Sequence, residues 1–224
     1  MLYSKYYHKD TNEDPLTSSV FENLMLLPDD IFWHILRASC YSNIGMPETV
    51  GRLTKFEFWP HWNAKGTTNN AYVEPDVFLR FELVDVIIEA KYYDHGGQYV
   101  DQWKNEIKSY YNEYTDDKKK LLFIAVGGNT KMNTESIEVN KNKIDIFKTT
   151  WLSMLTNIDK YKKELGFLSF INTEVATRQR LLDNIDLAFN INGVYNLQWF
   201  NTLEEKEPTI SEESITNMSQ YFNL

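Results

Sequence analysis

Two short charged segments stand out as a place where chemistry could occur. The first reads E-P-D at residues 74–76 and the second reads E-A-K at residues 89–91, with twelve residues between Asp76 and Glu89. Each segment lies in an apolar, β-rich run, and side chains along a strand alternate between the two faces of a sheet. This alternation places Asp76 on one face of the first strand, and Glu89 and Lys91 together on one face of the second. The acids and the lysine therefore form a candidate catalytic group.

The two runs predict a β-hairpin that closes at residues 82–83, in which residues whose numbers sum to 165 face each other. Asp76 then faces Glu89 with Cβ atoms about 4.5–5.5 Å apart, and like charges at that separation are destabilising. A divalent cation between the carboxylates removes the repulsion, and hard oxygen ligands favour Mg²⁺ or Mn²⁺. Lys91, on the same face as Glu89, is placed to approach a metal-bound water or a phosphate. The alternative is a charged sheet face held by cross-strand salt bridges.

The E-P-D and E-A-K segments with this spacing resemble the signature of the PD-(D/E)xK nuclease superfamily. The resemblance implies that Asp76 and Glu89 bind a metal ion, with the Ala90 carbonyl as a further ligand, and that Lys91 positions the nucleophile. It also implies a restriction-endonuclease-like fold, in which a four-stranded mixed β-sheet is flanked by helices.

Two more site residues follow from the same resemblance. An acid on the first helix often faces the metal, and here Glu13 is the better candidate and Asp14 the second. The alternative is that these acids stabilise the first turn of the helix. Some members carry a glutamine on the helix after the E-x-K strand, and Gln102 is our choice over Gln98, one turn earlier. The chain departs from the Gln-then-Tyr spacing of some branches, because Glu106 stands four residues after Gln102.

Other charged residues are interpreted as structural. Arg80 and Asp85 face each other in the predicted register, but they lie roughly 13 Å along the strands from the candidate metal site. Residues 118–120, three consecutive lysines, are typical of a solvated turn, with contact to a DNA backbone as the alternative. His95 is interpreted as a loop residue without a role, the alternative being contact with phosphate.

The elements that must position these residues follow from hydrophobic periodicity and from the positions of Gly and Pro. Helices are predicted at residues 15–27, 31–41, 98–114, 144–165 and 174–189. Strands are predicted at residues 52–59, 72–81, 84–92 and 121–126. Three strands connected in an antiparallel meander and a fourth after a helical crossover predict the α/β class, with helices covering the sheet.

Composition predicts one folded domain over residues 1–200 and an acidic C-terminal tail over residues 201–224, which holds five glutamates and one lysine. The chain has 224 residues, of which 42% are hydrophobic and 25% charged, so it can bury a core. A single cysteine, Cys40, excludes an intramolecular disulfide and a zinc site built from cysteines. Without an apolar stretch suited to a signal peptide or a membrane span, we expect a cytoplasmic protein.

The net charge is −9, from 23 basic and 32 acidic residues, which argues against broad electrostatic affinity for nucleic acid. The site and the resemblance nevertheless predict a Mg²⁺-dependent deoxyribonuclease (Mn²⁺ being the other candidate metal) that acts in bacterial or phage defence, restriction or DNA processing. Such a chain would need DNA as its substrate and a basic or ATPase partner subunit to supply positive charge. The alternative is a nuclease-fold binding or scaffold subunit of a DNA-acting complex with little turnover of its own.

Overall fold

The computed structural model describes residues 13–93, 96–114, 119–166 and 173–196. It has an α/β architecture built on a six-stranded mixed sheet in the order β1-β4-β5-β6-β8-β7, beside a two-stranded sheet of β2 and β3. The strands are β1 (Leu53–Phe58), β2 (Trp62–Asn63), β3 (Tyr72–Val73), β4 (Val77–Phe81), β5 (Val84–Ala90), β6 (Lys120–Val126), β7 (Glu135–Val139) and β8 (Asn142–Thr149). The acidic tail predicted at 201–224 lies outside the described residues.

The centre of the sheet has the predicted connectivity. Strands β1, β4 and β5 form an antiparallel meander, and β6 lies parallel to β5 after the chain passes through helix α3 (Val100–Glu113). The β4–β5 register pairs Arg80 with Asp85 and Phe78 with Ile87, so paired numbers sum to 165 as predicted. The prediction of an α/β fold with a mixed sheet is therefore confirmed.

The predicted number of four strands is wrong, because a second hairpin extends the sheet. Strands β7 and β8 pair through a tight turn at Asn140 and Lys141, whose φ angles of 52° and 68° suit a mirror-image hairpin turn. Strand β8 then pairs parallel to β6. The helix predicted over 144–165 thus begins only at α4 (Trp151–Leu165), where the Thr150 hydroxyl accepts a hydrogen bond from the Ser153 amide at 3.1 Å.

The strand predicted over residues 72–81 is divided in two. Its first part, β3, pairs with β2, whereas β4 pairs with β1 and β5. Pro75 lies at the division, and proline cannot donate a hydrogen bond to a neighbouring strand. As a result Asp76 immediately precedes β4, at the end of the main sheet.

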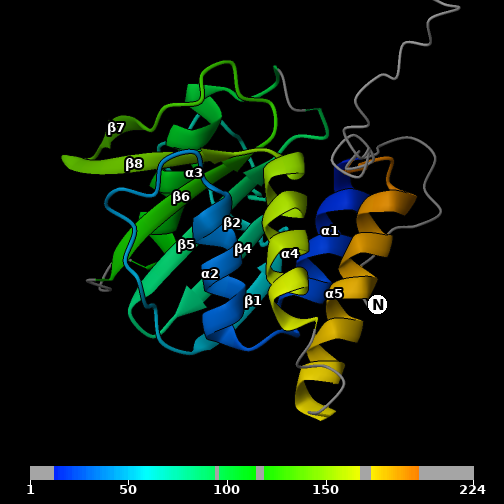
Figure 1. The fold of residues 1–224 in the computed structure, drawn as a ribbon. Coiled ribbons are helices and arrows are strands. Elements are labelled where there is room, and N and C mark those ends of the chain that lie inside the picture. The colour runs from blue at the N-terminus through cyan, green and yellow to red at the C-terminus, as the bar shows by residue number, and fades with distance from the viewer. Residues whose placement is uncertain (1–12, 94–95, 115–118, 167–172, 197–224) are drawn as a thin grey trace, which may run out of the picture.

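Four helices cover one face of the sheet, as Figure 1 shows: α1 (Glu13–Leu24), α2 (Asp29–Ser39), α4 and α5 (Thr173–Ile191). They bury apolar side chains of the central strands, including Leu79, Val86 and Ile124, in the larger core. Helix α3 covers the opposite face, where Phe78, Ile87 and Phe123 pack with residues such as Trp103, Ile107 and Tyr110. The face that carries Glu89 is therefore also buried, and α3 forms one wall of the candidate site.

Candidate functional site

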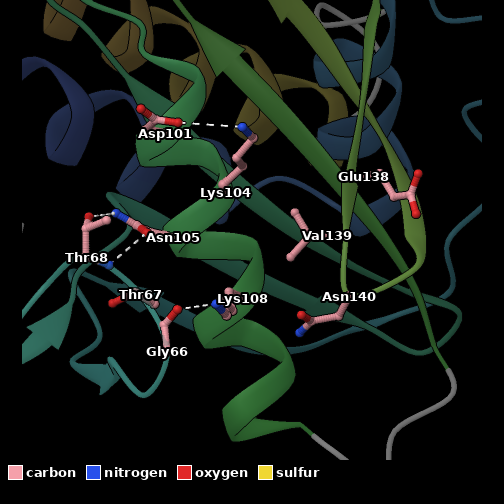
Figure 2. A pocket seen from close by; sticks show the side chains of 10 residues that line it. All are labelled: Gly66, Thr67, Thr68, Asp101, Lys104, Asn105, Lys108, Glu138, Val139 and Asn140. Carbon is pink, nitrogen blue, oxygen red and sulfur yellow. Dashed lines mark hydrogen bonds and ion pairs between the residues drawn. The ribbon is translucent and has the colours of Figure 1, made fainter.

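A cavity of about 350 Å³ lies on the outer side of α3, between the loop at residues 66–68 and the β7–β8 hairpin (Figure 2). Its polar groups largely bind one another. Lys104 Nζ lies 3.6 Å from the Asp101 carboxylate, Lys108 donates to the Gly66 carbonyl, and Asn105 donates to the Thr68 hydroxyl at 2.7 Å. The side chains of the predicted catalytic group do not line this cavity. The candidate chemistry lies on the inner side of the same helix.

Asp76 and Glu89 lie side by side at one end of the β4–β5 hairpin. The Ala90 amide donates a 2.7 Å hydrogen bond to Asp76 Oδ2, which links the residue before β4 to the last residue of β5. Asp76 is 8% exposed and Glu89 only 1%. The structure thus brings together the two acids that the register of the hairpin predicted.

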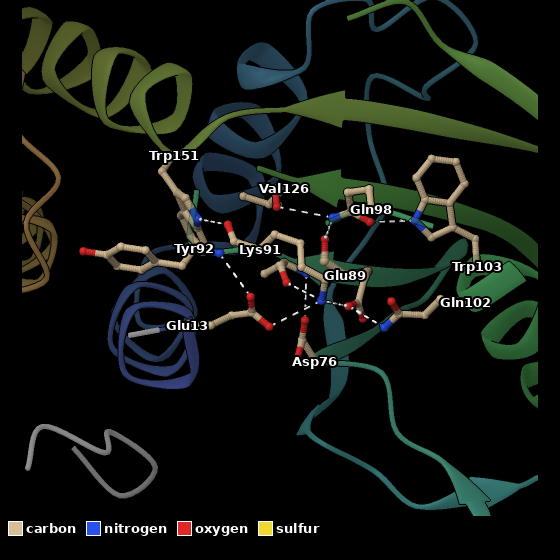
Figure 3. A network of polar contacts seen from close by, with 11 residues as sticks. Glu13, Asp76, Glu89, Lys91, Tyr92, Gln98, Gln102, Trp103, Val126 and Trp151 are labelled. Carbon is tan, nitrogen blue, oxygen red and sulfur yellow. Dashed lines mark hydrogen bonds and ion pairs between the residues drawn. The ribbon is translucent and has the colours of Figure 1, made fainter. Parts of the chain in front are cut away.

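Lys91 lies at the centre of this site, and Figure 3 shows its ammonium among the carboxylates of Glu13, Asp76 and Glu89. Its Nζ forms a short contact with Glu89 Oε1, lies 3.3 Å from Glu13 Oε1, and donates to the Ala90 carbonyl at 3.1 Å. The main chain of Lys91 is held as well, because its amide donates to the Val126 carbonyl. Trp151 donates from its indole nitrogen to the Lys91 carbonyl at 2.8 Å.

Glu13 reaches the site from the first turn of α1. In addition to its contact with Lys91, it accepts a 3.1 Å hydrogen bond at Oε2 from the Tyr92 amide. Of the two acids predicted at this helix start, Glu13 makes these contacts, while the Asp14 carbonyl accepts from the Ser18 hydroxyl within the helix. The structure thus places Glu13 beside Lys91, and its role as a metal ligand stays a prediction.

Both candidate glutamines contact Glu89. Gln102 donates to Glu89 Oε1 at 2.6 Å, and Gln98 donates to the Glu89 main-chain carbonyl at 3.0 Å. Trp103 donates from its indole nitrogen to Gln98 Oε1 at 2.7 Å and so fixes the orientation of that amide. Gln102, our choice from the sequence, contacts the acid itself, whereas Gln98 holds its backbone.

Glu106 is a site residue that sequence reasoning did not assign. It lies one turn after Gln102 on α3 and is 1% exposed, and neither of its carboxyl oxygens has a hydrogen-bond donor among the described residues. Its carboxyl contacts that of Glu89, so a protonated Glu106 can donate to Glu89. The four-residue step from Gln102 was the available signal, because residues four apart share one face of a helix.

The electrostatics of the site favour protonated acids and a charged lysine. Burial, and next the nearby Glu89 charge, raise the pKa of Asp76 well above its usual range, while the Ala90 amide opposes this. Burial and the Glu89 charge likewise raise the pKa of Glu106 well above its usual range. For Lys91 burial lowers the pKa, but Glu89, Asp76 and Glu13 together outweigh it and raise the pKa. The ammonium is therefore the charge that offsets these acids.

Two glycines hold the aliphatic stem of Lys91. A Cβ atom added to Gly128 would lie 2.8 Å from Lys91 Cγ and 2.9 Å from its Cβ, distances too short for carbon atoms. One added to Gly97 would lie 3.3 Å from Lys91 Cδ. Both glycines have positive φ angles, +64° and +103°, which L-residues rarely adopt. The absence of a side chain at Gly97 and Gly128 therefore leaves room for the Lys91 side chain between two separate loops.

The other charged residues considered in the sequence lie elsewhere. Lys119 contacts Asp85 at 3.6 Å and donates to the Phe81 carbonyl, and Lys120 donates to the Gly45 carbonyl. These two lysines thus form contacts within the protein. Lys118 and His95 lie outside the described residues.

The donor groups around Lys91 are of the type that binds Mg²⁺ or Mn²⁺: three carboxylates and a main-chain carbonyl, all hard oxygen ligands. Within the described ranges, however, no group of three or more His, Cys, Asp or Glu side chains is arranged to hold a metal ion. The ammonium of Lys91 lies at the point toward which these oxygens are directed. The ligand atoms are therefore of the type that binds a hard divalent cation, but in this structure they surround the ammonium of Lys91.

The chain is similar to the uncharacterised protein PM0110 of Pasteurella multocida (strain Pm70), with 30% identity over 206 residues. The alignment covers 87% of this chain and 75% of that protein. No family model matches the chain, and no solved structure matches it significantly. In the part of the chain that the structure describes, no helix combines the length and apolar character needed to cross a membrane.

Proposed function

The chain belongs to the same family as the Pasteurella multocida protein, and we propose that it is a metal-dependent nuclease that hydrolyses phosphodiester bonds of DNA. The observation that carries the proposal is the convergence of Glu13, Asp76, Glu89 and Lys91 at one end of the sheet (Figure 3). The E-P-D and E-A-K segments and the meander followed by a crossover support a restriction-endonuclease-like arrangement of this site.

In the proposed reaction, Asp76, Glu89, Glu13 and the Ala90 carbonyl hold Mg²⁺ or Mn²⁺. When bound, such an ion polarises a phosphate and lowers the pKa of a coordinated water. Two glutamines hold Glu89 in position: Gln102 donates a hydrogen bond to its Oε1, and Gln98 donates one to its main-chain carbonyl.

Lys91 supplies positive charge next to the reacting phosphate. An ammonium positioned there stabilises negative charge that develops in the transition state, and it can hold the attacking water by a hydrogen bond. The flanking Gly97 and Gly128 confine Cβ, Cγ and Cδ of Lys91, so the inner part of the side chain is positioned before substrate arrives.

The acidic chain neutralises few phosphates, so we infer that the isolated protein binds DNA weakly and that a basic or ATPase partner subunit strengthens binding. The same net charge of −9 favours the second candidate, a nuclease-fold scaffold subunit with little turnover.

Plasmid nicking separates the two candidates. Purified protein is incubated with supercoiled DNA in Mg²⁺, in Mn²⁺ and in EDTA, and compared with the variants Asp76→Asn and Asp145→Asn. Asp145 lies in β8, where its carboxylate accepts from the Ser136 hydroxyl, so its substitution is a matched control. We expect metal-dependent nicking by wild type and Asp145→Asn, and none by Asp76→Asn. Nicking that is equal in all three proteins would indicate a contaminant, and its absence in all three would favour the scaffold.

A further inference from the structure

The three groups that contact the Lys91 ammonium are also three of the proposed metal ligands. Glu89 Oε1, Glu13 Oε1 and the Ala90 carbonyl all lie within contact distance of Nζ. Two cations cannot share these oxygens without strong mutual repulsion, because the site is buried and poorly screened. The lysine and a metal ion are therefore competitors for the same ligands.

We propose that Lys91 is an internal counter-ion, which occupies the cation position of the metal-free protein and must move its ammonium away before a divalent metal binds. The proposal deepens the proposed function, because it concerns the metal site on which that function rests. Lys91 then has two opposed effects, lowering the affinity for metal while serving the reaction.

The packing of the lysine stem indicates how this movement occurs. The contacts of Gly97 and Gly128 fall on Cβ, Cγ and Cδ of Lys91, so the inner part of the side chain is confined. The Lys91 side chain as a whole is 19% exposed, which leaves a path toward solvent. Rotation about the outer bonds of the side chain can therefore carry the ammonium off Glu89 and Glu13 while the stem stays in place.

The first test measures the affinity for Mn²⁺ by isothermal titration calorimetry. Lys91→Met keeps an unbranched side chain and removes the charge. Lys148→Met is the matched control, because Lys148 is also buried and ion-paired, with Nζ 2.8 Å from Glu135 Oε1. We expect Lys91→Met to bind Mn²⁺ at least about tenfold more tightly than wild type, since a competing charge at contact distance is removed. Lys148→Met should stay within about twofold of wild type. Equal or weaker binding by Lys91→Met overturns the proposal.

The second test uses the wild-type protein, and so does not depend on the folding of a variant. An amine-acylating reagent is applied with and without Mn²⁺, and modification of each lysine is followed by mass spectrometry. Metal should accelerate modification of Lys91 several-fold and leave that of Lys148 unchanged. Unchanged modification of Lys91 at saturating Mn²⁺ overturns the proposal. Neither test requires DNA cleavage, so an inactive protein that passes both would refute the nuclease function alone.

Discussion

The two ends of the β4–β5 hairpin each bury a carboxylate on the same face of the sheet, but the partners of the two carboxylates differ. At the closed end, Asp85 accepts a 2.9 Å hydrogen bond from the Tyr110 hydroxyl and lies 3.5 Å from Arg80 Nε and 3.6 Å from Lys119 Nζ. At the open end, Glu89 shares one ammonium, that of Lys91, with Glu13. One helix, α3, contributes to both ends, through Tyr110 and Gln102.

The difference lies in the local balance of charge. Asp85 is one acid between two basic side chains, which is the composition of a structural ion-pair cluster. The open end gathers four acids, Glu13, Asp76, Glu89 and Glu106, around one lysine. Burial raises the pKa of Asp85 as it does that of Glu89, so burial by itself does not distinguish the two ends. The excess of acidic groups over basic ones is what makes the open end suited to a cation, because a bound cation favours their ionised form.

The largest expected difference concerns catalysis. Glu89→Gln keeps the shape of the side chain but removes the charge that would bind metal, and we expect cleavage to fall by about a thousandfold or more. Asp85→Asn should retain near-wild-type cleavage per folded molecule, because Asp85 lies away from the proposed metal. Initial nicking rates, scaled to the folded fraction from circular dichroism, provide the measurement. Comparable losses in the two variants would remove the distinction between the two ends.

For the free energy of unfolding we expect the opposite order, with Asp85→Asn losing more than Glu89→Gln. Asp85→Asn removes the acid that Arg80 and Lys119 share, and removing one partner of a buried pair is strongly destabilising. Because the two basic side chains are partly exposed, at 19% and 22%, we expect a loss of about 2 kcal/mol. Glu89→Gln removes the nearest acid from Lys91, but Glu13 and Asp76 still face the ammonium, so we expect its free energy of unfolding without metal to fall by less than that of Asp85→Asn. Urea unfolding in EDTA measures both, and a larger loss for Glu89→Gln would contradict the comparison.

The glycines around Lys91 should affect activity to an intermediate degree. A Cβ atom at Gly128 would lie 2.8 Å from both the Gly96 carbonyl oxygen and Lys91 Cγ, so Gly128→Ala displaces the lysine side chain or the Gly96 main chain. We expect about a tenfold loss of cleavage, since small displacements of a catalytic group are costly. Gly97→Ala, with its milder contact, should cost less. Gly96→Ala and Gly45→Ala are matched controls, because both glycines have positive φ angles but a Cβ atom there meets nothing within 4 Å. Losses in the controls as large as that of Gly128→Ala would mean that backbone strain, and not Lys91, explains the effect.

The smallest expected effect concerns pH. The pKa of Glu106 is raised in the folded protein by burial and by Glu89, so its contribution to stability is full at low pH and is lost as pH rises through the raised value. Glu106→Gln keeps a donor toward Glu89 and cannot ionise. The melting temperature in EDTA should therefore fall less between pH 5 and pH 8 in this variant than in wild type. Each kcal/mol of unfolding free energy that wild type loses with pH corresponds to roughly 2–4 °C of melting temperature.

Glu113→Gln serves as the control for that experiment. Glu113 lies on the same helix, but it is exposed and accepts a hydrogen bond from the Asn63 amide. Its melting profile should follow that of wild type. A profile of Glu106→Gln that also follows wild type would show that Glu106 is ionised in the folded protein or does not contact Glu89.

Local patterns in the sequence predicted the central part of the fold well. Alternation of side chains and the short turn set the β4–β5 register, and helical periodicity located α3. The β7–β8 hairpin was missed because residues 144–149 were joined to the helical pattern of α4. The Asn140–Lys141 turn and the alternation of Ile144 and Ile146 with polar residues were local signals for the hairpin, but they were overridden by the apolar residues that continue into α4.

The sequence by itself determined that Asp76, Glu89 and Lys91 share one end of a hairpin, because strand geometry relates residues close along the chain. Only the tertiary structure decided that Glu106 faces Glu89 and that Lys91 lies between two glycines from separate loops. The placement of Glu13, 78 residues from Lys91, was suggested by resemblance but requires α1 to pack beside the sheet. Contacts across such distances depend on how helices pack, because no local rule relates the directions of side chains on separate elements.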